Sequence, residues 1–252
     1  MISNGFPVDN ETIKLPKLGR VKIVNHRHKT GIAKSCTISM TPTNEFYISI
    51  LWKEDEMDEI LPKVEKEIGI DLGLTDLAIC SDGTKFPILK SLRNNLSKIK
   101  KEQRKLSKMT KGSNNYNRQK LKVAKLHQHI ANQRKDYLHK ISYKITNENQ
   151  VISLEDLNVK GMMKNRHLSK ATASQKFYEF RTRLQGKCAE KGIELRIADR
   201  WYPSSRRCHN CGQIRKDLKL SNRVYQCSCG YCEDRDLNAA LNLRDVKTYQ
   251  SA

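Results

Sequence analysis

Residues 208–243, CHNCGQIRKDLKLSNRVYQCSCGYCEDRDLNAALNL, contain two close cysteine pairs followed by an acidic turn and a helical segment. Cys208 and Cys211 form a C-x2-C pair, and Cys227 and Cys229 form a tighter C-x-C pair after a spacer of ordinary zinc-ribbon length. Two pairs of thiolates are the usual ligand set of a closed, tetrahedral structural Zn²⁺ site. The spacing therefore predicts a structural zinc site in this stretch.

Two alternatives remain open at this stage. Unpaired cysteines are often buried as small hydrophobic side chains, although the glycines after each pair, Gly212 and Gly230, favour metal-binding turns. Cys232 is a fifth thiol nearby and could replace Cys227 or Cys229. The second pair of ligands is thus less firmly assigned than the first.

The charge of the chain predicts a polyanionic partner. The 252 residues include 48 Lys and Arg against 27 Asp and Glu, which gives a net charge of +21. Nucleic acid is favoured over a membrane because the sequence contains no long apolar run. Eight cysteines without a secretory signal indicate a reducing, cytoplasmic compartment, so Cys36, Cys80 and Cys188 are expected to be packing residues.

The first 60 residues are expected to form a small antiparallel β-unit. Residues 35–40 and 46–52 have the composition of a hairpin, with turn residues at 42–45. The acidic residues 54–59 are interpreted as a solvated linker. The strands are interpreted as the end of a larger β-domain.

Residues 92–145 have the apolar periodicity of two long antiparallel helices, separated by a turn at 111–115. Lysines and arginines dominate residues 98–111. Charges of one sign repel one another unless a polyanion neutralises them, so we expect contacts with a nucleic-acid backbone. A basic loop at 158–170, an amphipathic helix at 175–191 and a strand at 193–198 follow.

Three carboxylates occupy positions suited to catalysis. Asp71 ends an apolar strand between Gly69 and Gly73, Glu155 ends the strand after the helices, and Asp236 opens the last helix. Taken alone, Asp71 could equally be an ordinary turn aspartate. Converging acids would bind two Mg²⁺ or Mn²⁺ ions for phosphodiester hydrolysis, since carboxylate oxygens suit these hard cations. The order of strands and helices predicts a mixed α/β fold.

Four motifs together resemble the TnpB family, which comprises transposon-encoded OrfB proteins related to compact type V CRISPR effectors. The resemblance extends over roughly residues 13–246, and its four motifs occur in the order of the family: GIDLG at 69–73, LEDLNVKGM at 154–162, PSSRRCHNCG at 203–212 and DRDLNAALNL at 234–243. The resemblance implies an RNase H-like (RuvC) nuclease domain with a long helical-hairpin insertion and an inserted zinc ribbon, preceded by β-strands of a partial wedge barrel.

The resemblance also implies domain limits and residue roles. The expected domains are a wedge remnant at 1–60, a RuvC-like domain at 61–200 with its hairpin at about 90–147, a zinc ribbon at 201–233, and the last RuvC motif with the C-terminal helix at 234–252. The implied catalytic acids are Asp71, Glu155 and Asp236, with Asp236 preferred over Asp234 because it directly precedes LNAA. The implied zinc ligands are Cys208, Cys211, Cys227 and Cys229.

The implied function is that of a transposon-associated, RNA-guided DNA endonuclease. Its partners would be DNA and a guide RNA transcribed from the element, without a membrane, in the cytoplasm of a prokaryote near the nucleoid. Full-length members carry further N-terminal segments, so the chain is expected to be a truncated or decayed copy or half of a split gene, which would then have the missing N-terminal portion as a partner. The alternative is a non-cleaving DNA- or RNA-binding remnant or regulator. A strand-joining transposase is less favoured because no Tyr- or His-rich joining motif is found.

Overall fold

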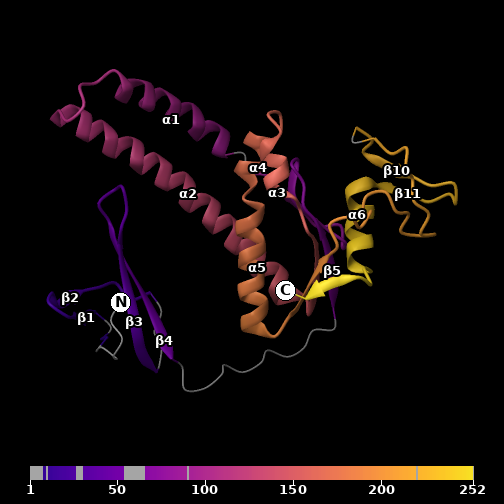
Figure 1. The fold of residues 1–252 in the computed structure, drawn as a ribbon, viewed down its shortest axis with the longest axis horizontal. Coiled ribbons are helices and arrows are strands. Elements are labelled where there is room, and N and C mark those ends of the chain that lie inside the picture. Colours follow the sequence, from indigo (N-terminus) through magenta and orange to yellow (C-terminus); the bar gives the residue numbers. More distant parts are fainter. Residues whose placement is uncertain are drawn as a thin grey trace. The chain divides into compact units, whose positions relative to one another are not determined.

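The computed structural model describes residues 8–9, 11–26, 31–53, 66–89, 91–219 and 221–251. By internal contacts the chain divides into two compact units (Figure 1): residues 1–59 with 95–130, and residues 60–94 with 131–252. The predicted linker at 54–59 and the predicted domain limit near residue 60 lie outside the described residues. The domain limits expected from the sequence therefore stay predictions.

The first unit contains two strand pairs and a helical hairpin. Strand β1 (Thr12–Leu15) pairs antiparallel with β2 (Gly19–Lys22), and β3 (Ile32–Met40) pairs antiparallel with β4 (Phe46–Lys53). The hairpin predicted at 35–52 is thus present, and Cys36 packs in the core of this unit as expected. The two pairs are separate sheets, so the partial barrel stays a prediction.

The helical segment forms α1 (Ser91–Ser107) and α2 (Asn114–Glu148), as the periodicity predicts. Within the first unit, Glu102 of α1 is buried against α2, where it accepts a hydrogen bond from Gln119 Nε2 at 2.8 Å and pairs with Lys122 Nζ at 3.2 Å. These two partners lower the pKa of Glu102 to about 2. The carboxylate therefore joins the two helices while remaining charged.

The second unit is built on a six-stranded mixed sheet with the order β12-β9-β8-β5-β6-β7. The central strands β5 (Glu67–Asp71), β8 (Val151–Glu155) and β9 (Glu194–Ala198) are parallel. Strands β6 (Asp76–Cys80), β7 (Lys85–Pro87) and β12 (Tyr249–Ser251) run antiparallel to their neighbours. The class is mixed α/β, as predicted.

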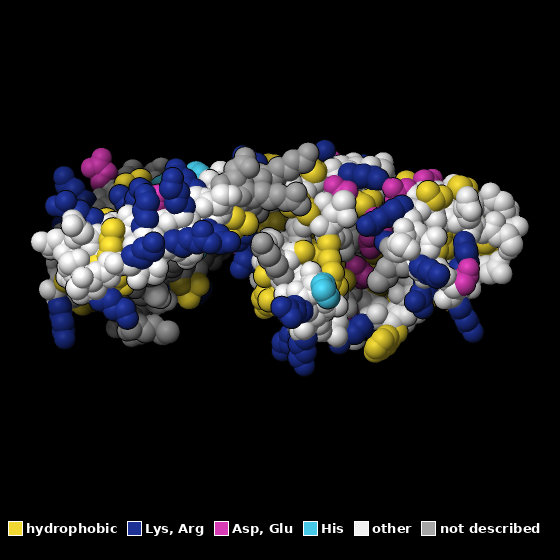
Figure 2. Space-filling model, turned by 90° about the horizontal axis from the view of Figure 1, so that it is seen from above, with side chains coloured by type: hydrophobic (Ala, Val, Ile, Leu, Met, Phe, Trp, Pro, Cys, Tyr) yellow, Lys and Arg dark blue, Asp and Glu magenta, His cyan; other side chains and the backbone are white. Residues whose placement is uncertain are grey.

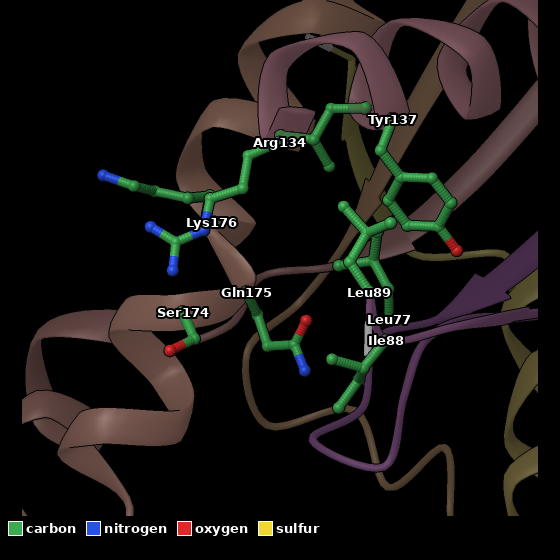
Figure 3. Close-up of a pocket in the computed structure, with 9 residues that line it drawn as sticks. Leu77, Ile88, Leu89, Arg134, Tyr137, Ser174, Gln175 and Lys176 are labelled. Carbon is green, nitrogen blue, oxygen red and sulfur yellow. The ribbon is translucent and has the colours of Figure 1, made fainter. Parts of the chain in front are cut away.

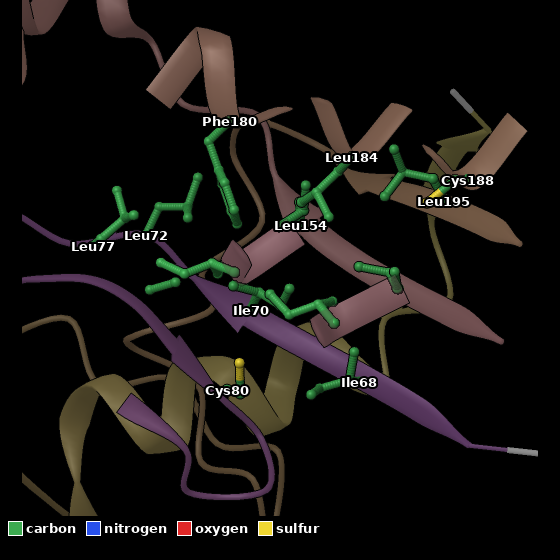
Figure 4. Close-up of a cluster of buried hydrophobic side chains, with 14 of the residues drawn as sticks. Ile68, Ile70, Leu72, Leu77, Cys80, Leu154, Phe180, Leu184, Cys188 and Leu195 are labelled. Carbon is green, nitrogen blue, oxygen red and sulfur yellow. The ribbon is translucent and has the colours of Figure 1, made fainter. Parts of the chain in front are cut away.

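One face of the sheet packs against α5 (Phe177–Lys191) and the C-terminal part of α2 (Figure 4). Side chains of successive strand residues alternate between the two faces. Ile68 and Ile70 of β5 and Ile152 and Leu154 of β8 point into this core, together with the aromatic and aliphatic residues of α5. Cys80 and Cys188 are buried in the same cluster, which confirms their prediction as packing residues.

The opposite face of the sheet contacts α6 (Arg235–Arg244). A Cβ atom placed on Gly69 would lie 2.0 Å from the carbonyl oxygen of Ala240 and 2.3 Å from the amide nitrogen of Arg244. Both are backbone atoms, so neither can move away as a side chain could. Only glycine at this position allows the helix to approach β5 so closely.

The predicted basic loop at 158–170 is wrong in part, because it contains α3 (Val159–Lys164) and the start of α4 (Ser169–Gln175). The Asn158 side chain accepts a hydrogen bond from the Gly161 amide and so caps α3. Helices of one or two turns carry too few apolar residues for the periodicity to reveal them. The three-residue strands β7 and β12 escaped prediction for the same reason.

A small cavity lies between β6, the segment after β7, and helices α2 and α4 (Figure 3). It is lined mainly by apolar groups such as Leu77, Ile88 and Leu138, and its volume is about 20 Å³. That volume holds about one water molecule. Among the described residues, no helix has the length and apolar character needed to cross a membrane.

Replacing Gly69 by alanine should force α6 away from β5, because the added methyl group meets backbone atoms of Ala240 and Arg244 in α6. We expect the free energy of unfolding to fall by about 1–3 kcal/mol, measured by chemical denaturation. Gly186→Ala is the matched control, because nothing lies within 4 Å of its added Cβ on α5. That change should be neutral or stabilising by up to about 1 kcal/mol. Equal stability of the two variants would contradict the close approach at Gly69.

Candidate active site and metal centre

Two of the predicted acids end neighbouring parallel strands. Ile70 of β5 is paired with Leu154 of β8, so Asp71 and Glu155 are the next residues along the same register. Because Ile70 and Leu154 point into the core with α5, the alternation of side chains places Asp71 and Glu155 on the face covered by α6. Both carboxylates are half-buried.

The third predicted acid, Asp236, lies in the first turn of α6. Asp234 caps this helix: its side chain accepts hydrogen bonds from the amides of Asp236 at 2.9 Å and Leu237 at 3.2 Å. Lys85 Nζ of β7 also lies 2.9 Å from its other oxygen. Burial would raise the pKa of Asp234, but Lys85 and the two amides hold it below its usual value. Asp234 thus has a structural role, which supports the choice of Asp236 over it.

Burial raises the pKa values of the two acids at the strand ends, and neighbouring charges act on that of Asp71 as well. Burial, followed by the negative charges of Glu155 and Asp236, raises the pKa of Asp71 well above its usual value, against the opposing charge of Arg235. Burial also raises the pKa of Glu155 to about 7, although the amide of Leu72 donates a hydrogen bond to it. Carboxylates in this state gain stability from a bound cation, and their oxygens are of the type that Mg²⁺ and Mn²⁺ prefer. Among the described residues, however, only the four cysteines lie close enough together to form a ready metal-binding group.

The neighbouring acid Asp156 has a different environment from Glu155. Its two carboxylate oxygens lie 2.8 Å from Arg181 Nη1 and 2.5 Å from Arg200 Nη2. Asp236 also has basic neighbours, with Arg235 Nη2 at 3.1 Å and Arg223 Nη1 at 3.8 Å. Sequence reasoning missed these cations and Lys85, because each comes from an element distant in the chain or lacks a motif of its own.

The four predicted zinc ligands meet at one point. The Sγ atoms of Cys208, Cys211, Cys227 and Cys229 all lie within 4.8 Å of one another. Cys208 and Cys229 are 3.7 Å apart between sulfurs, and Cys211 and Cys227 are 3.5 Å apart. Four sulfurs about 2.3 Å from a central ion lie at comparable separations, so the set fits a tetrahedral metal.

Two similar turns present these sulfurs. Gly212 and Gly230 follow the pairs with φ of +77° and +88°, a conformation that favours glycine. In the first turn the Cys208 amide donates to the Gln213 carbonyl, and in the second the Cys227 amide donates to the Tyr231 carbonyl. Short strands β10 (Val224–Gln226) and β11 (Cys232–Asp234) pair antiparallel and connect the second turn to α6.

The structure decides between the alternatives for the second cysteine pair. Cys232 lies exposed on β11 and is not part of the four-sulfur cluster, so Cys227 and Cys229 are the better ligands. His209, inside the first cysteine turn, is half-buried. Its side chain is 25% exposed, and its Nδ1 lies 3.7 Å from Asp245 Oδ2.

Helix α6 joins the cysteine cluster to the acids. Asn238 and Asn242 are buried and lie one turn apart on α6. Asn238 donates to the Arg207 carbonyl at 2.8 Å and accepts from the His209 amide at 3.1 Å. Asn242 donates to the carbonyls of Ser204 and Arg207. Sequence reasoning assigned no role to these two asparagines. The signal that could have found them is two polar residues spaced i, i+4 among the apolar residues of the helix.

The sequence of this chain is similar to models of two protein families. Residues 50–166 match a family described as "Probable transposase" (OrfB), and residues 177–243 match a "Cas12f1-like, TNB domain". A chain in the cryo-EM structure of the Cas12f1–sgRNA–target DNA complex has a similar fold, with a TM-score of 0.51 and 20% identity over 75% of this chain and 41% of that one.

Longer relatives are similar to this chain over most of its length. A "Putative RNA-guided DNA endonuclease" from Streptomyces pristinaespiralis is 39% identical over 82% of this chain and 51% of its own length. The similarly named InsQ of Escherichia coli is 34% identical over 93% of this chain and 62% of its own length. The chain therefore belongs to the TnpB (OrfB) family and spans about half to three fifths of the length of these relatives.

The raised pKa of Glu155 predicts a pH-dependent stability. Below about pH 4.5 the group is protonated in both the folded and the unfolded chain. Between about pH 4.5 and 7 only the unfolded chain ionises, so stability falls as the pH rises, and above pH 7 the loss is complete.

Without added divalent cations, Glu155→Gln should therefore raise the Tm at pH 8 by on the order of several degrees and weaken the fall in Tm between pH 4.5 and 7. Asp136→Asn, on the exposed surface of α2, is the control and should leave the pH profile unchanged. If the Tm of Glu155→Gln depends on pH in the same way as that of the unsubstituted chain, the raised pKa of Glu155 in the folded chain is contradicted.

Cys208→Ser should remove bound zinc, because it deletes the one fully buried ligand of the cluster. We expect less than one zinc per chain by elemental mass spectrometry, together with a lower Tm. The matched control is Cys232→Ser, which should retain the metal because its sulfur lies outside the cluster. Zinc loss from the control and retention in Cys208→Ser would overturn this ligand set.

Proposed function

We propose that this chain is a transposon-associated, RNA-guided DNA endonuclease that hydrolyses phosphodiester bonds with two divalent metal ions. The observation that supports this most strongly is the position of Asp71, Glu155 and Asp236, two at neighbouring strand ends and one in the first turn of α6. Burial, and then the charges of Glu155 and Asp236, raise the pKa of Asp71. Membership of the TnpB family and the names of the relatives support the same activity.

The topology supports an RNase H-like (RuvC) assignment of the second unit. Three consecutive antiparallel strands, β5 to β7, are followed by β8 and β9, which extend the sheet in parallel from β5. Helices α1 and α2 lie in the chain between β7 and β8, and the cysteine cluster lies between β9 and α6. We therefore assign the hairpin and the ribbon as insertions into this nuclease fold.

Asp71, Glu155 and Asp236 are the proposed ligands of the catalytic metal ions. When bound, two such ions activate a water nucleophile and stabilise the leaving oxygen. The protein supplies three carboxylates, which must be deprotonated to act as ligands. Arg223 and Arg235 lie beside Asp236 and are suited to contact the phosphate that flanks the cut. The cysteine cluster is the proposed structural Zn²⁺ site.

The basic surfaces support nucleic-acid partners. On α1, residues spaced three and four apart place Lys101, Arg104, Lys105 and Lys108 along one side of the helix, with Lys100 beside them. Dark blue Lys and Arg side chains also occur across the face drawn in Figure 2. Such charges bind phosphates without reading sequence. We propose DNA and a guide RNA from the element as the partners, in the cytoplasm and near the nucleoid of a prokaryote.

The proposal is tested by incubating the purified chain with labelled DNA, Mg²⁺ and RNA transcribed from the end of the element. We expect cleavage that requires all three components. Asp71→Asn should reduce the cleavage rate by at least about 100-fold while leaving nucleic-acid binding intact, because it removes a metal ligand but little volume.

Asp136→Asn is the matched control, since Asp136 lies exposed on α2, where it pairs with Lys140, and should leave the rate close to that of the unsubstituted chain. DNA binding without any cleavage, with or without RNA, would support the alternative of a non-cleaving nucleic-acid-binding protein. Cleavage that persists in Asp71→Asn would refute the assigned acids.

A further inference from the structure

A second feature lies immediately beside Glu155. A cavity of about 380 Å³ opens between the end of β8, the first residues of α3 and the start of α5. Its apolar lining includes Leu72, Leu154 and Phe177, and Glu155 itself forms part of the wall. The volume is within the range of cavities that bind small organic groups. The core packing of the sheet does not fill it.

The cavity carries an exposed aromatic ring. Tyr178, the second residue of α5, lines it and is 75% exposed. The preceding residue, Phe177, is buried in the core and anchors this end of the helix. A tyrosine ring held on a helix beside an apolar wall offers a flat surface on which a nucleobase can stack.

The rim of the cavity is positively charged. Asp156 holds Arg181 on one carboxylate oxygen and Arg200 on the other, so both guanidinium groups have fixed positions. Their side chains are 33% and 47% exposed, which leaves donors available to a phosphate. Together with Lys160 they place three cations against the two carboxylates of Glu155 and Asp156 on this wall. The excess of positive charge on this wall favours an anionic ligand.

We propose that this cavity holds one unstacked nucleotide of the DNA strand next to the bond that is cut. The base stacks on Tyr178 against the apolar wall, and a phosphate of that nucleotide contacts Arg181 and Arg200. A duplex covers both faces of each base, so the site takes a nucleotide of a single strand. The placement beside the cut rests on the proposed function, whereas the binding of the nucleotide does not.

The proposal is tested by photocrosslinking the full chain, in its Asp71→Asn form, to a single-stranded DNA oligonucleotide with one 5-iododeoxyuridine. We expect the adduct in the tryptic peptide of residues 177–181, on Tyr178, since Phe177 and Phe180 are buried. Tyr178→Ala should abolish this adduct and weaken binding of the oligonucleotide by roughly 5- to 150-fold. Tyr178→Phe should retain both, because stacking needs the ring and not the hydroxyl.

Tyr143→Ala is the matched control: Tyr143 is another exposed tyrosine, 59% accessible on α2, and does not line the cavity. It should leave the Tyr178 adduct unchanged. A ribonucleotide oligomer with 5-iodouridine forms the second arm, and an adduct with RNA alone would overturn the assignment to the DNA strand. The absence of any adduct on Tyr178 would overturn the site. An adduct that forms at another residue in Tyr178→Ala, with unchanged affinity for the oligonucleotide, would also overturn it.

The outcome is separable from that of the proposed function. If the Tyr178 adduct forms but the unsubstituted chain does not cut DNA, the endonuclease proposal is refuted and the nucleotide site still stands. A chain that cuts DNA at an unchanged rate after Tyr178→Ala, and forms no adduct, would refute the nucleotide site and leave the endonuclease standing.

Discussion

The contact between α6 and β5 at Gly69 is the constraint on which the arrangement of the second unit depends. Backbone meets backbone there, and even one methyl group would separate the two elements. The helix that approaches so closely carries Asp236 in its first turn, on the face of the sheet where Asp71 and Glu155 end their strands. Through Asn238 and Asn242 the same helix also holds the backbone that begins the cysteine cluster. One short helix thus connects the acids with the cysteine cluster.

Acids in the second unit fall into two groups, those with basic partners and those with raised pKa values, and the second group is suited to binding a cation. Acids adjacent in sequence to the converging ones are neutralised: Asp156 by two arginines, and Asp234 by Lys85 and the helix amides. Asp71 and Glu155 instead have raised pKa values: burial raises both, and the charges of Glu155 and Asp236 raise that of Asp71 further. Such an arrangement lowers the stability of the metal-free protein, and a bound divalent ion would restore it.

The two family matches divide the proposed acids and the cysteine cluster between them. The match at 50–166 contains Asp71 and Glu155, and the match at 177–243 contains the four cysteines and Asp236. The two matched segments meet in space at the contact of α6 with β5 and the acids at its edge. Neither segment contains all three acids, so the proposed active site depends on both being packed together.

The sequence by itself determined the mixed α/β class, the long helices and the cysteine spacing, because periodicity and short-range motifs are local properties. It also singled out three acids by their positions at strand ends and at a helix start, and the family resemblance gave them catalytic roles. The spacing of Asp71, Glu155 and Asp236 along the chain says nothing about their distance in space. The tertiary structure decided the rest. It excluded Cys232 from the sulfur cluster, placed Asp234 at a helix cap, and paired Asp156 with Arg181 and Arg200. These outcomes depend on contacts between residues far apart in sequence, which no local pattern encodes.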